Sequence, residues 1–162
     1  MCAKPKNSDK PAERNVAQNR AASYNYHLLE KYEAGMVLVG TEVKALREGK
    51  ANLRDAYAVV RGNAVWLVNC HISQYLPGGP YNHEPLRPRK LLMNRSEIFK
   101  LGSKTQQQGL TLVPLRIYFR DGIAKCEIAL ARGRKQHDRR QAERDKEARR
   151  EASEAIYRYR RR

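Results

Sequence analysis

The sequence predicts a mainly β protein, in which an antiparallel β domain with small flanking helices is followed by a basic C-terminal tail. Between residues 21 and 130, short apolar and β-branched runs alternate with turn signals, as is typical of antiparallel strands. From Ala131 to Arg162 the large apolar residues are only Ile156, Tyr157 and Tyr159, too few to offset the entropy lost on ordering this segment. We therefore divide the chain into a flexible segment 1–18, a β domain 19–130 and a tail 131–162 that is disordered when free.

The first part of the domain predicts two strands and a short helix. Tyr24–Tyr32 is rich in aromatic residues and Met36–Val39 is a continuous apolar run, so each favours a strand. Glu42–Arg47 follows Thr41, which can cap a helix, and it starts with an acid and ends with a base. This pattern predicts a helix over Glu42–Arg47.

Two β-hairpins are predicted from their turns. Ala56–Arg61 and Ala64–Asn69 flank Gly62-Asn63, a dipeptide that tolerates the positive φ of a two-residue turn. Thr111–Phe119 and Ile123–Leu130 flank Arg120-Asp121-Gly122 in the same way. Each pair of segments is therefore expected to form neighbouring antiparallel strands.

A loop and a second helix separate the two hairpins. Tyr75–Pro88 contains four prolines and two consecutive glycines, which predicts a long loop without regular structure. Asn94 and Glu97 have the spacing of a capping box, so we expect a helix over Ser96–Leu101 that ends at Gly102. Five or six short antiparallel strands with small helices fit a partly open barrel of the OB-fold type better than an α/β sheet.

Several classes of protein are excluded by what the sequence lacks. No run approaches the roughly 18 apolar residues of a membrane-spanning helix, and the N-terminus has no apolar signal-peptide core, so we expect a cytoplasmic protein without a membrane partner. The three cysteines are far apart and the histidines have no metal-ligand spacing, so we expect reduced thiols, no metal and no cofactor. Gly102-Ser103-Lys104-Thr105 lacks the residue order of a phosphate loop, and no nucleophile–base arrangement is present. The protein is therefore not expected to be an enzyme.

The charge of the chain predicts a nucleic-acid partner. The 162 residues include 33 Lys and Arg against 17 Asp and Glu, a net charge of +16. Residues 131–162 hold 13 basic and 6 acidic side chains, which is nearly half of that excess. A basic surface neutralises phosphates and releases their counterions, whereas an anionic membrane surface is the weaker alternative. Nine tyrosines add flat rings that can stack on unpaired bases.

Six separate motifs resemble one bacterial family. They are Tyr32–Gly35, Gly40–Asn52, His71–Ser73, Arg89–Asn94, Leu112–Leu115 and Gly133–Arg140. Together they resemble small protein B, the family that binds transfer-messenger RNA, in the same order and at similar spacing from about Asn19 to Arg140. The first 18 residues and the last twenty resemble this family in composition only.

The resemblance implies an OB-type barrel that binds the tRNA-like part of transfer-messenger RNA and delivers it to stalled ribosomes. This process, trans-translation, rescues the ribosome and tags the nascent peptide for degradation. The implied partners are transfer-messenger RNA, the small-subunit decoding region and messenger channel of the stalled ribosome, and elongation factor Tu through the aminoacylated RNA, all bound by a monomer. The alternative is a general basic single-stranded-RNA-binding protein or ribosome-associated RNA chaperone on the same barrel.

The resemblance also implies which residues contact the RNA: Glu33, Leu92, Asn94 and Lys125. Other interpretations stay open for three of them, since Glu33 could orient a neighbouring base, Leu92 could belong to the core and Asn94 could cap a helix. Phosphate contacts are expected from four basic side chains: Lys44, Arg47, Arg89 and Lys90. Each of these four could equally be a solvated surface residue.

The tail motif is implied to enter the decoding region and the empty messenger channel. Its residues are Gly133, Arg134, Lys135, His137, Asp138, Arg139 and Arg140. Gly133 would be the pivot, and His137 would stack or hydrogen-bond on ribosomal RNA. Arg134 and Arg139 stand where the family has lysines, so the charge is kept while an ammonium becomes a planar guanidinium. Residues 136–158 contain no Gly or Pro, so we expect a helix on the ribosome; a solvated, non-specific electrostatic arm is the alternative.

Overall fold

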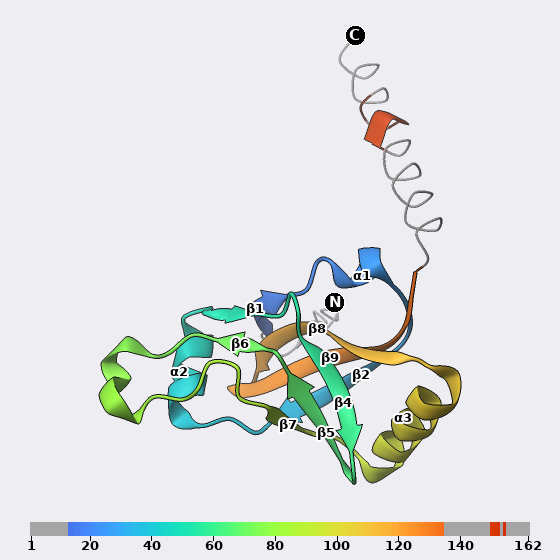
Figure 1. Ribbon diagram of the computed structural model, residues 1–162. Coiled ribbons are helices and arrows are strands. Elements are labelled where there is room, and N and C mark those ends of the chain that lie inside the picture. The colour runs from blue at the N-terminus through green and yellow to red at the C-terminus, as the bar shows by residue number, and fades with distance from the viewer. Residues whose placement is uncertain (1–12, 135–149, 153, 155–162) are drawn as a thin grey trace, which may run out of the picture.

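The computed structural model describes residues 13–134, 150–152 and 154 of the chain (Figure 1). Over residues 13–134 the elements are β1 (Glu13–Gln18), α1 (Ala22–Asn25), β2 (Tyr26–Met36), α2 (Gly40–Arg47), β3 (Ala51–Asn52), β4 (Tyr57–Arg61), β5 (Ala64–Val68), β6 (His71–Ile72), the 3-10 segment η1 (Leu76–Tyr81), β7 (Arg89–Leu92), α3 (Arg95–Gln108), β8 (Thr111–Arg120) and β9 (Ile123–Gly133). The described tail residues, 150–152 and 154, are helical.

Seven of these strands form one antiparallel sheet, which confirms the prediction of a mainly β fold. The strand order is β1-β8-β4-β5-β7-β2-β9, and β8 also pairs with β9. The pairings therefore run from β8 through β4, β5, β7, β2 and β9 back to β8, while β1 adds to β8 from outside this circuit. Strands β3 and β6 form a separate two-stranded sheet.

The hydrophobic core comes from alternate residues of the paired strands. Val65 and Leu67 of β5, Ile117 of β8 and Ile128 of β9 are fully buried, because successive side chains of a strand point to opposite faces of the sheet. Helices α2 and α3 add Ala45, Leu46, Ile98 and Leu101 to this core. The two helices lie at opposite ends of the sheet (Figure 1), so they cover the core from two sides.

Both predicted hairpins are present. Arg61 pairs with Ala64 in the β4–β5 hairpin, and Arg120 pairs with Ile123 in the β8–β9 hairpin, so each turn has two residues. Asp121 and Gly122 have φ values of +52° and +77°, the pair of left-handed conformations that a type I′ turn requires. The hairpin turns were thus readable from the sequence.

Two predicted boundaries were wrong. The two strands expected over Tyr24–Tyr32 and Met36–Val39 are replaced by one continuous strand, β2, because Glu33, Ala34 and Gly35 between them pair with β9. The helix expected over Ser96–Leu101 extends to Gln108, since ordinary helix formers follow Gly102 and tolerate its low helix propensity. Gly109, in the left-handed conformation, ends α3 instead.

The limits of the β domain also differ from the prediction. Residues 13–18, expected to be flexible, form β1 and pair with β8. At the other end, β9 continues past Leu130 to Gly133, which pairs with Tyr26. Within the described residues the sheet therefore extends from Glu13 to Gly133.

A buried charge network holds α2, β7 and the segment between them. Glu42 and Arg89 have fully buried side chains, and Arg89 Nε lies 2.9 Å from Glu42 Oε1. Arg87 donates to Glu42 Oε2 at 2.7 Å, and Arg89 also donates to the carbonyls of Cys70 and Pro85. Each buried charge thus has several partners, as burial away from water demands.

Glu42 also caps α2, a role that the sequence suggested for Thr41. Val39 is the N-cap residue, and its backbone N–H donates to Glu42 Oε2 at 2.9 Å. Burial raises the pKa of Glu42, but hydrogen bonds from Arg87 and Val39 and the charge of Arg89 outweigh it and hold that pKa below its ordinary value of 4.5.

Replacing Glu42 by Gln is expected to lower the free energy of unfolding by roughly 3–5 kcal/mol, because two arginines lose their buried counter-charge. The folded protein releases the Glu42 proton more readily than the unfolded chain does, so this contribution is complete above about pH 4.5 and is lost as the pH falls. Urea unfolding between pH 3 and 7 should therefore show a flatter pH dependence in Glu42→Gln than in the wild type. Glu84→Gln, which replaces an exposed acid of the proline-rich segment that carries Arg87, is the control; equal stability of both variants would contradict this role of Glu42.

Candidate nucleic-acid interface

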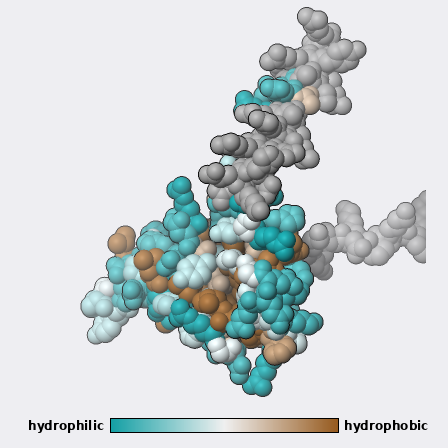
Figure 2. All heavy atoms as spheres, turned by 45° about the vertical axis from the view of Figure 1, so that its right-hand side comes forward, coloured by the Kyte–Doolittle hydropathy of each residue, from teal (hydrophilic) through white to brown (hydrophobic). Residues whose placement is uncertain are grey.

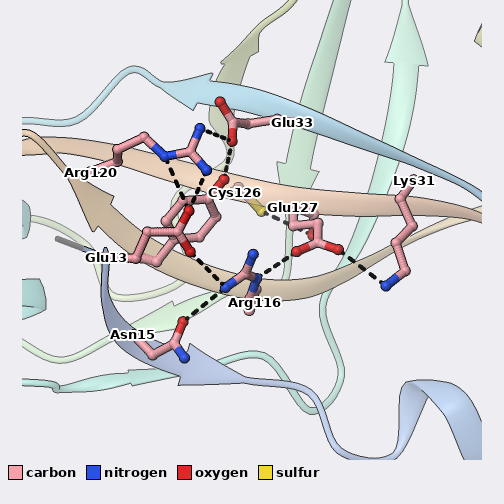
Figure 3. A network of polar contacts seen from close by, with 9 residues as sticks. Glu13, Asn15, Lys31, Glu33, Arg116, Arg120, Cys126 and Glu127 are labelled. Atoms are coloured by element: carbon pink, nitrogen blue, oxygen red, sulfur yellow. Dashed lines mark hydrogen bonds and ion pairs between the residues drawn. The ribbon is translucent and has the colours of Figure 1, made fainter. Parts of the chain in front are cut away.

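One face of the sheet carries a network of charged side chains from β1, β2, β8 and β9 (Figure 3). We call it the charged sheet face; its members are Glu13, Lys31, Glu33, Arg116, Arg120, Lys125 and Glu127. Alternation along the strands puts these residues on one side, since Lys31 and Glu33, or Arg116 and Arg120, are separated by an even number of residues. Sequence neighbours of the network, such as Ala34 and Ile117, point into the core.

Glu33 lies in this face as a fixed, ionised carboxylate. Lys125 Nζ lies 2.5 Å from Glu33 Oε1, Arg120 Nη1 lies 2.9 Å from Oε2, and the Tyr118 hydroxyl also donates to Oε2. Hydrogen bonds from Lys125 and then Tyr118 hold the pKa of Glu33 below its ordinary value. The side chain keeps 37% of its surface exposed, so a ligand can still reach it.

Glu127 stands directly opposite Glu33 across the β2–β9 pair, where two like charges would repel. Separate cations neutralise the two acids. Arg116 Nε lies 2.5 Å and Lys31 Nζ lies 3.4 Å from Glu127. Lys125 and Arg120 form ion pairs with Glu33 instead. The network therefore gives each of the two adjacent carboxylates its own pair of cations.

Tyr118 is a buried residue whose hydroxyl orients Glu33, a role that the sequence analysis missed. Its ring is 1% exposed, with the guanidinium groups of Arg116 and Arg120 at 4.4 and 5.5 Å from the ring centre. Burial and the hydrogen bond to Glu33 raise the pKa of Tyr118 to about 12, so the hydroxyl stays a donor at neutral pH. The signal in the sequence was the alternation of Arg116, Tyr118 and Arg120 along one strand.

Gly35 lies next to three of the expected RNA contacts, Glu33, Leu92 and Lys125. It pairs with Lys125 of β9 on one side and with Leu92 of β7 on the other, two residues from Glu33. A Cβ at Gly35 would lie 3.4 Å from Leu92 Cβ and 3.7 Å from Leu92 Cδ1, so the Leu92 side chain lies directly beside this glycine. Leu92 is 53% exposed, which contradicts its alternative assignment to the core.

Asn94 and Lys90 extend this region along β7. Lys90 is exposed and stands two residues before Leu92, on the same side of the strand. Asn94 is exposed at the N-cap of α3, and Glu97 accepts a hydrogen bond from its backbone N–H at 3.2 Å. We name this region the Gly35 surface; it comprises Glu33, Gly35, Lys90, Leu92, Asn94 and Lys125.

The remaining expected phosphate contacts lie elsewhere. Lys44 and Arg47 are exposed on α2, a helix that contributes no residue to the Gly35 surface. The expectation that Arg89 contacts phosphate is wrong, because its side chain is fully buried and bonded to Glu42, Cys70 and Pro85. Arg89 instead stabilises the strand that carries Leu92.

Only the start of the expected ribosome-binding motif falls within the described residues. Gly133 ends β9, and the Arg134 backbone N–H donates to the Asn25 carbonyl at 3.0 Å. Lys135, His137, Asp138, Arg139 and Arg140 lie outside the described residues. Further along the tail, Arg150 Nε lies 3.0 Å from Glu154 Oε1, one helical turn away.

Two further observations concern classes considered in the sequence analysis. Across residues 13–134 and the described part of the tail, no three His, Cys, Asp or Glu side chains are grouped to hold a metal ion. No helix in the same residues is long and apolar enough to cross a membrane.

On the face shown in Figure 2, apolar side chains gather near the centre and hydrophilic ones surround them.

The fold and this site define a mainly β, antiparallel protein that presents paired cations and carboxylates on an open sheet face. The SmpB protein family matches residues 16–158, nearly the whole chain, and this chain belongs to that family.

Relatives and a solved structure agree with this assignment. An SsrA-binding protein of Desulforudis audaxviator is 54% identical, over 88% of this chain and 94% of the relative. An SsrA-binding protein of Trichodesmium erythraeum is 52% identical, over 89% of this chain and 93% of the relative. A chain in the structure described as "tmRNA-SmpB: a journey to the center of the bacterial ribosome" is 46% identical, with a TM-score of 0.62 over 74% of this chain and 84% of that chain.

Replacing Lys125 by Met is expected to raise the pKa of Glu33 toward 4.5, because it removes the strongest hydrogen bond to this carboxylate. Tyr118→Phe should raise it as well, since the ring is kept and only the hydroxyl donor is lost. Carboxyl carbon NMR shifts followed through a pH titration measure this pKa. Lys31→Met, which removes a contact to Glu127 only, is the control, and an unchanged Glu33 pKa in Lys125→Met would refute the assignment.

Proposed function

We propose that this protein binds the tRNA-like part of transfer-messenger RNA and delivers it to stalled ribosomes for trans-translation. The observation that carries the proposal is the Gly35 surface, where Glu33, Leu92, Asn94 and Lys125 come from three strands and a helix N-terminus to one place. The printed names of the relatives, SsrA-binding proteins, support the same RNA as ligand.

The chemistry of this surface suits a folded RNA. Lys90 and Lys125 attract phosphates, and the exposed Leu92 offers an apolar contact to a nucleoside. Glu33 repels phosphate, so its role in an RNA site is to accept a hydrogen bond from a 2′-OH or a base amino group. Because three donors hold Glu33 before the RNA arrives, little ordering entropy is lost on binding.

We also propose that the sheet is a barrel of the OB-fold type. The circuit of pairings from β8 through β4, β5, β7, β2 and β9 back to β8 supports this proposal. Closure leaves no exposed sheet edge within the circuit, and OB-type barrels are common platforms for nucleic acids.

In this proposal the tail, residues 131–162, is the ribosome-binding element. Gly133 would act as the pivot, and Arg134, Lys135, Asp138, Arg139 and Arg140 would reach the decoding region and the empty messenger channel with His137. The protein would act in the cytoplasm as a monomer that does no catalysis itself, and would meet elongation factor Tu through the aminoacylated RNA.

The alternative function is a general single-stranded-RNA-binding protein or RNA chaperone. Bulk tRNA separates the two, since a general binder is displaced in proportion to the phosphate added and a specific one is not. Sequencing the RNA that co-purifies with the protein is the second discriminating measurement.

Glu33→Gln is expected to weaken binding to transfer-messenger RNA about 10-fold while leaving binding to random RNA equal or stronger. A carboxylate cannot contribute to phosphate attraction, so a loss confined to one RNA identifies a specific acceptor. Filter binding at moderate salt measures both affinities, and Glu127→Gln on the same sheet face is the matched control. Equal loss on both RNAs would show that Glu33 is structural.

Asn94→Ala separates the cap from the RNA contact. A lost helix cap costs about 1 kcal/mol of stability, whereas a lost RNA contact leaves the melting temperature unchanged and lowers affinity. We expect a lower affinity together with a stability loss of at most about 1 kcal/mol, because Asn94 is the N-cap residue of α3 in a capping box with Glu97 and its side chain is exposed. A lower melting temperature with normal affinity would contradict the contact.

Truncation after Arg134 should keep RNA affinity and abolish tagging of stalled peptides. The described β domain ends at this residue, while most of the tail charge lies beyond it. Binding to transfer-messenger RNA and peptide tagging in a reconstituted translation reaction measure the two effects. Tagging by the truncated protein would contradict the proposed role of the tail.

A further inference from the structure

Two arginines of β8 converge on one carboxylate of the charged sheet face (Figure 3). Arg116 Nη1 lies 3.2 Å from Glu13 Oε2, and Arg120 Nε lies 3.1 Å from Glu13 Oε1. We call Arg116 and Arg120 the arginine fork. Two planar guanidinium groups, each bound to a different oxygen of one anion, also suit the two non-bridging oxygens of a phosphodiester. Glu13 therefore occupies a position in which a phosphate would fit.

The arginine fork has other partners that hold it in place. Arg116 Nε lies 2.5 Å from Glu127, and Arg120 Nη1 lies 2.9 Å from Glu33. Both guanidinium groups also lie over the buried ring of Tyr118. The two arginine side chains keep 30% and 29% of their surface exposed, so an anion from solution can reach them. Loss of the Glu13 contact would thus leave both cations in position and accessible.

Glu13 stands at the end of an edge strand. It is the first residue of β1, which pairs with β8 from outside the circuit of pairings. The register of this pair shifts between Asn15 and Ala17, and the side chains of β1 that pack against the core, Val16 and Ala17, come only after Asn15. Because the ends of edge strands open at low free-energy cost, Glu13 can leave the fork while the rest of β1 stays packed.

The arginine fork adjoins the Gly35 surface. Lys125 of that surface pairs with Gly35 on one side and with Tyr118 on the other. Arg120 touches Glu33 of the same surface directly. A nucleotide bound at Glu33 therefore has a phosphate, its own or that of its neighbour, within reach of the fork.

Charge and space on this face both favour a phosphate. The charged sheet face has four cations and three acids, so without Glu13 the cations exceed the acids by two. A hollow of about 420 Å³ lies beside Arg116, with Asn15 and Lys31 in its lining. Its volume is in the range of small-ligand sites, so the sugar attached to the phosphate finds room there.

We propose that the arginine fork is a phosphate-binding subsite of the transfer-messenger-RNA interface, which Glu13 occupies in the free protein and leaves when the RNA binds. The inference rests on the proposed function and deepens it, since it adds two cations to the site of Glu33 and Lys125. The ligand is a phosphodiester of the RNA segment that contacts Glu33. Glu13 weakens binding, because the RNA must first displace it.

The first test compares Glu13→Gln with the control Glu48→Gln in the full-length protein. Glu48→Gln removes the same charge at an exposed acid that pairs with Lys50, outside the fork. Filter binding at moderate salt measures the affinity for transfer-messenger RNA. Glu13→Gln should bind roughly 2- to 10-fold more tightly than the wild type, the range for one or two exposed ion pairs, and Glu48→Gln less than 2-fold.

The direction of this effect separates the proposal from a structural role of Glu13. If Glu13 only held β1 in place, its loss would leave the affinity unchanged or lower it. Either result would overturn the proposal, and so would an equal gain in Glu13→Gln and Glu48→Gln, which would reflect total charge alone.

The two arginines provide a second test. Arg116→Gln should lower the affinity for transfer-messenger RNA and reduce the slope of log affinity against log salt by about 1, as expected for one lost phosphate contact. In a protein that carries both Arg116→Gln and Arg120→Gln, adding Glu13→Gln should bring no gain, because no fork is left to expose. A gain as large as in the protein with both arginines would overturn the proposal.

Carboxyl carbon NMR observes the displacement of Glu13 directly. In the free protein the hydrogen bond from Arg120 holds the pKa of Glu13 below its ordinary value of 4.5. At pH 7, saturating transfer-messenger RNA should move the Glu13 signal to its position in the protein with both arginines replaced. An unchanged signal at saturation would overturn the proposal.

The proposed function fails separately from this inference. A wild-type protein without preference for transfer-messenger RNA over bulk tRNA contradicts the proposed function, whatever Glu13→Gln does. A wild-type preference for transfer-messenger RNA, with no gain in Glu13→Gln, contradicts the arginine fork alone.

Discussion

The buried ion pair of Glu42 with Arg89 is the interaction on which the Gly35 surface depends. Glu42 caps α2 through Val39, binds Arg89 at the start of β7, and binds Arg87 at the end of the proline-rich segment. Strand β7 carries Lys90 and Leu92 of the Gly35 surface. A charge network of this kind contributes little net stability compared with apolar packing, but it admits one arrangement of its partners. Its effect here is to fix the positions of three elements relative to each other.

The register of the strands decides which side chains meet on the Gly35 surface. In an antiparallel sheet, residues that face each other across a pair lie on the same face, so the neighbours of one position on both sides determine what meets there. At Gly35 these neighbours are Lys125 and Leu92, and the glycine adds no side chain between them. A one-residue slip of β2 would turn Glu33 into the core. The buried residues beside it, such as Ala34, prevent that slip.

Local patterns predicted much of this fold, and long-range pairing accounts for what they missed. The turns at Gly62 and Gly122 depend on backbone conformations that a dipeptide reveals, so both hairpins were predictable. The strand β1 was not, because its partner β8 lies about a hundred residues away and Glu13 gains its arginines only through that pairing. Similarly, Arg89 resembles any exposed cation in the sequence, and only the fold places a buried acid beside it. The expected contacts Glu33, Leu92 and Lys125 came from the resemblance, and the register places Leu92 and Lys125 on either side of Gly35, two residues from Glu33.

The path of β9 has a mechanical consequence. This strand carries Lys125 near its start, is paired along its length with both β2 and β8, and leads through Gly133 into the tail. Tension on the tail would act parallel to β9, so the hydrogen bonds on its two sides would resist in shear and together rather than opening one after another. The Arg134 backbone bond to Asn25 adds a clamp where the strand ends. A pull at the C-terminus would therefore be transmitted to the sheet as a rigid body, with the spacing between Glu33, Leu92 and Lys125 preserved.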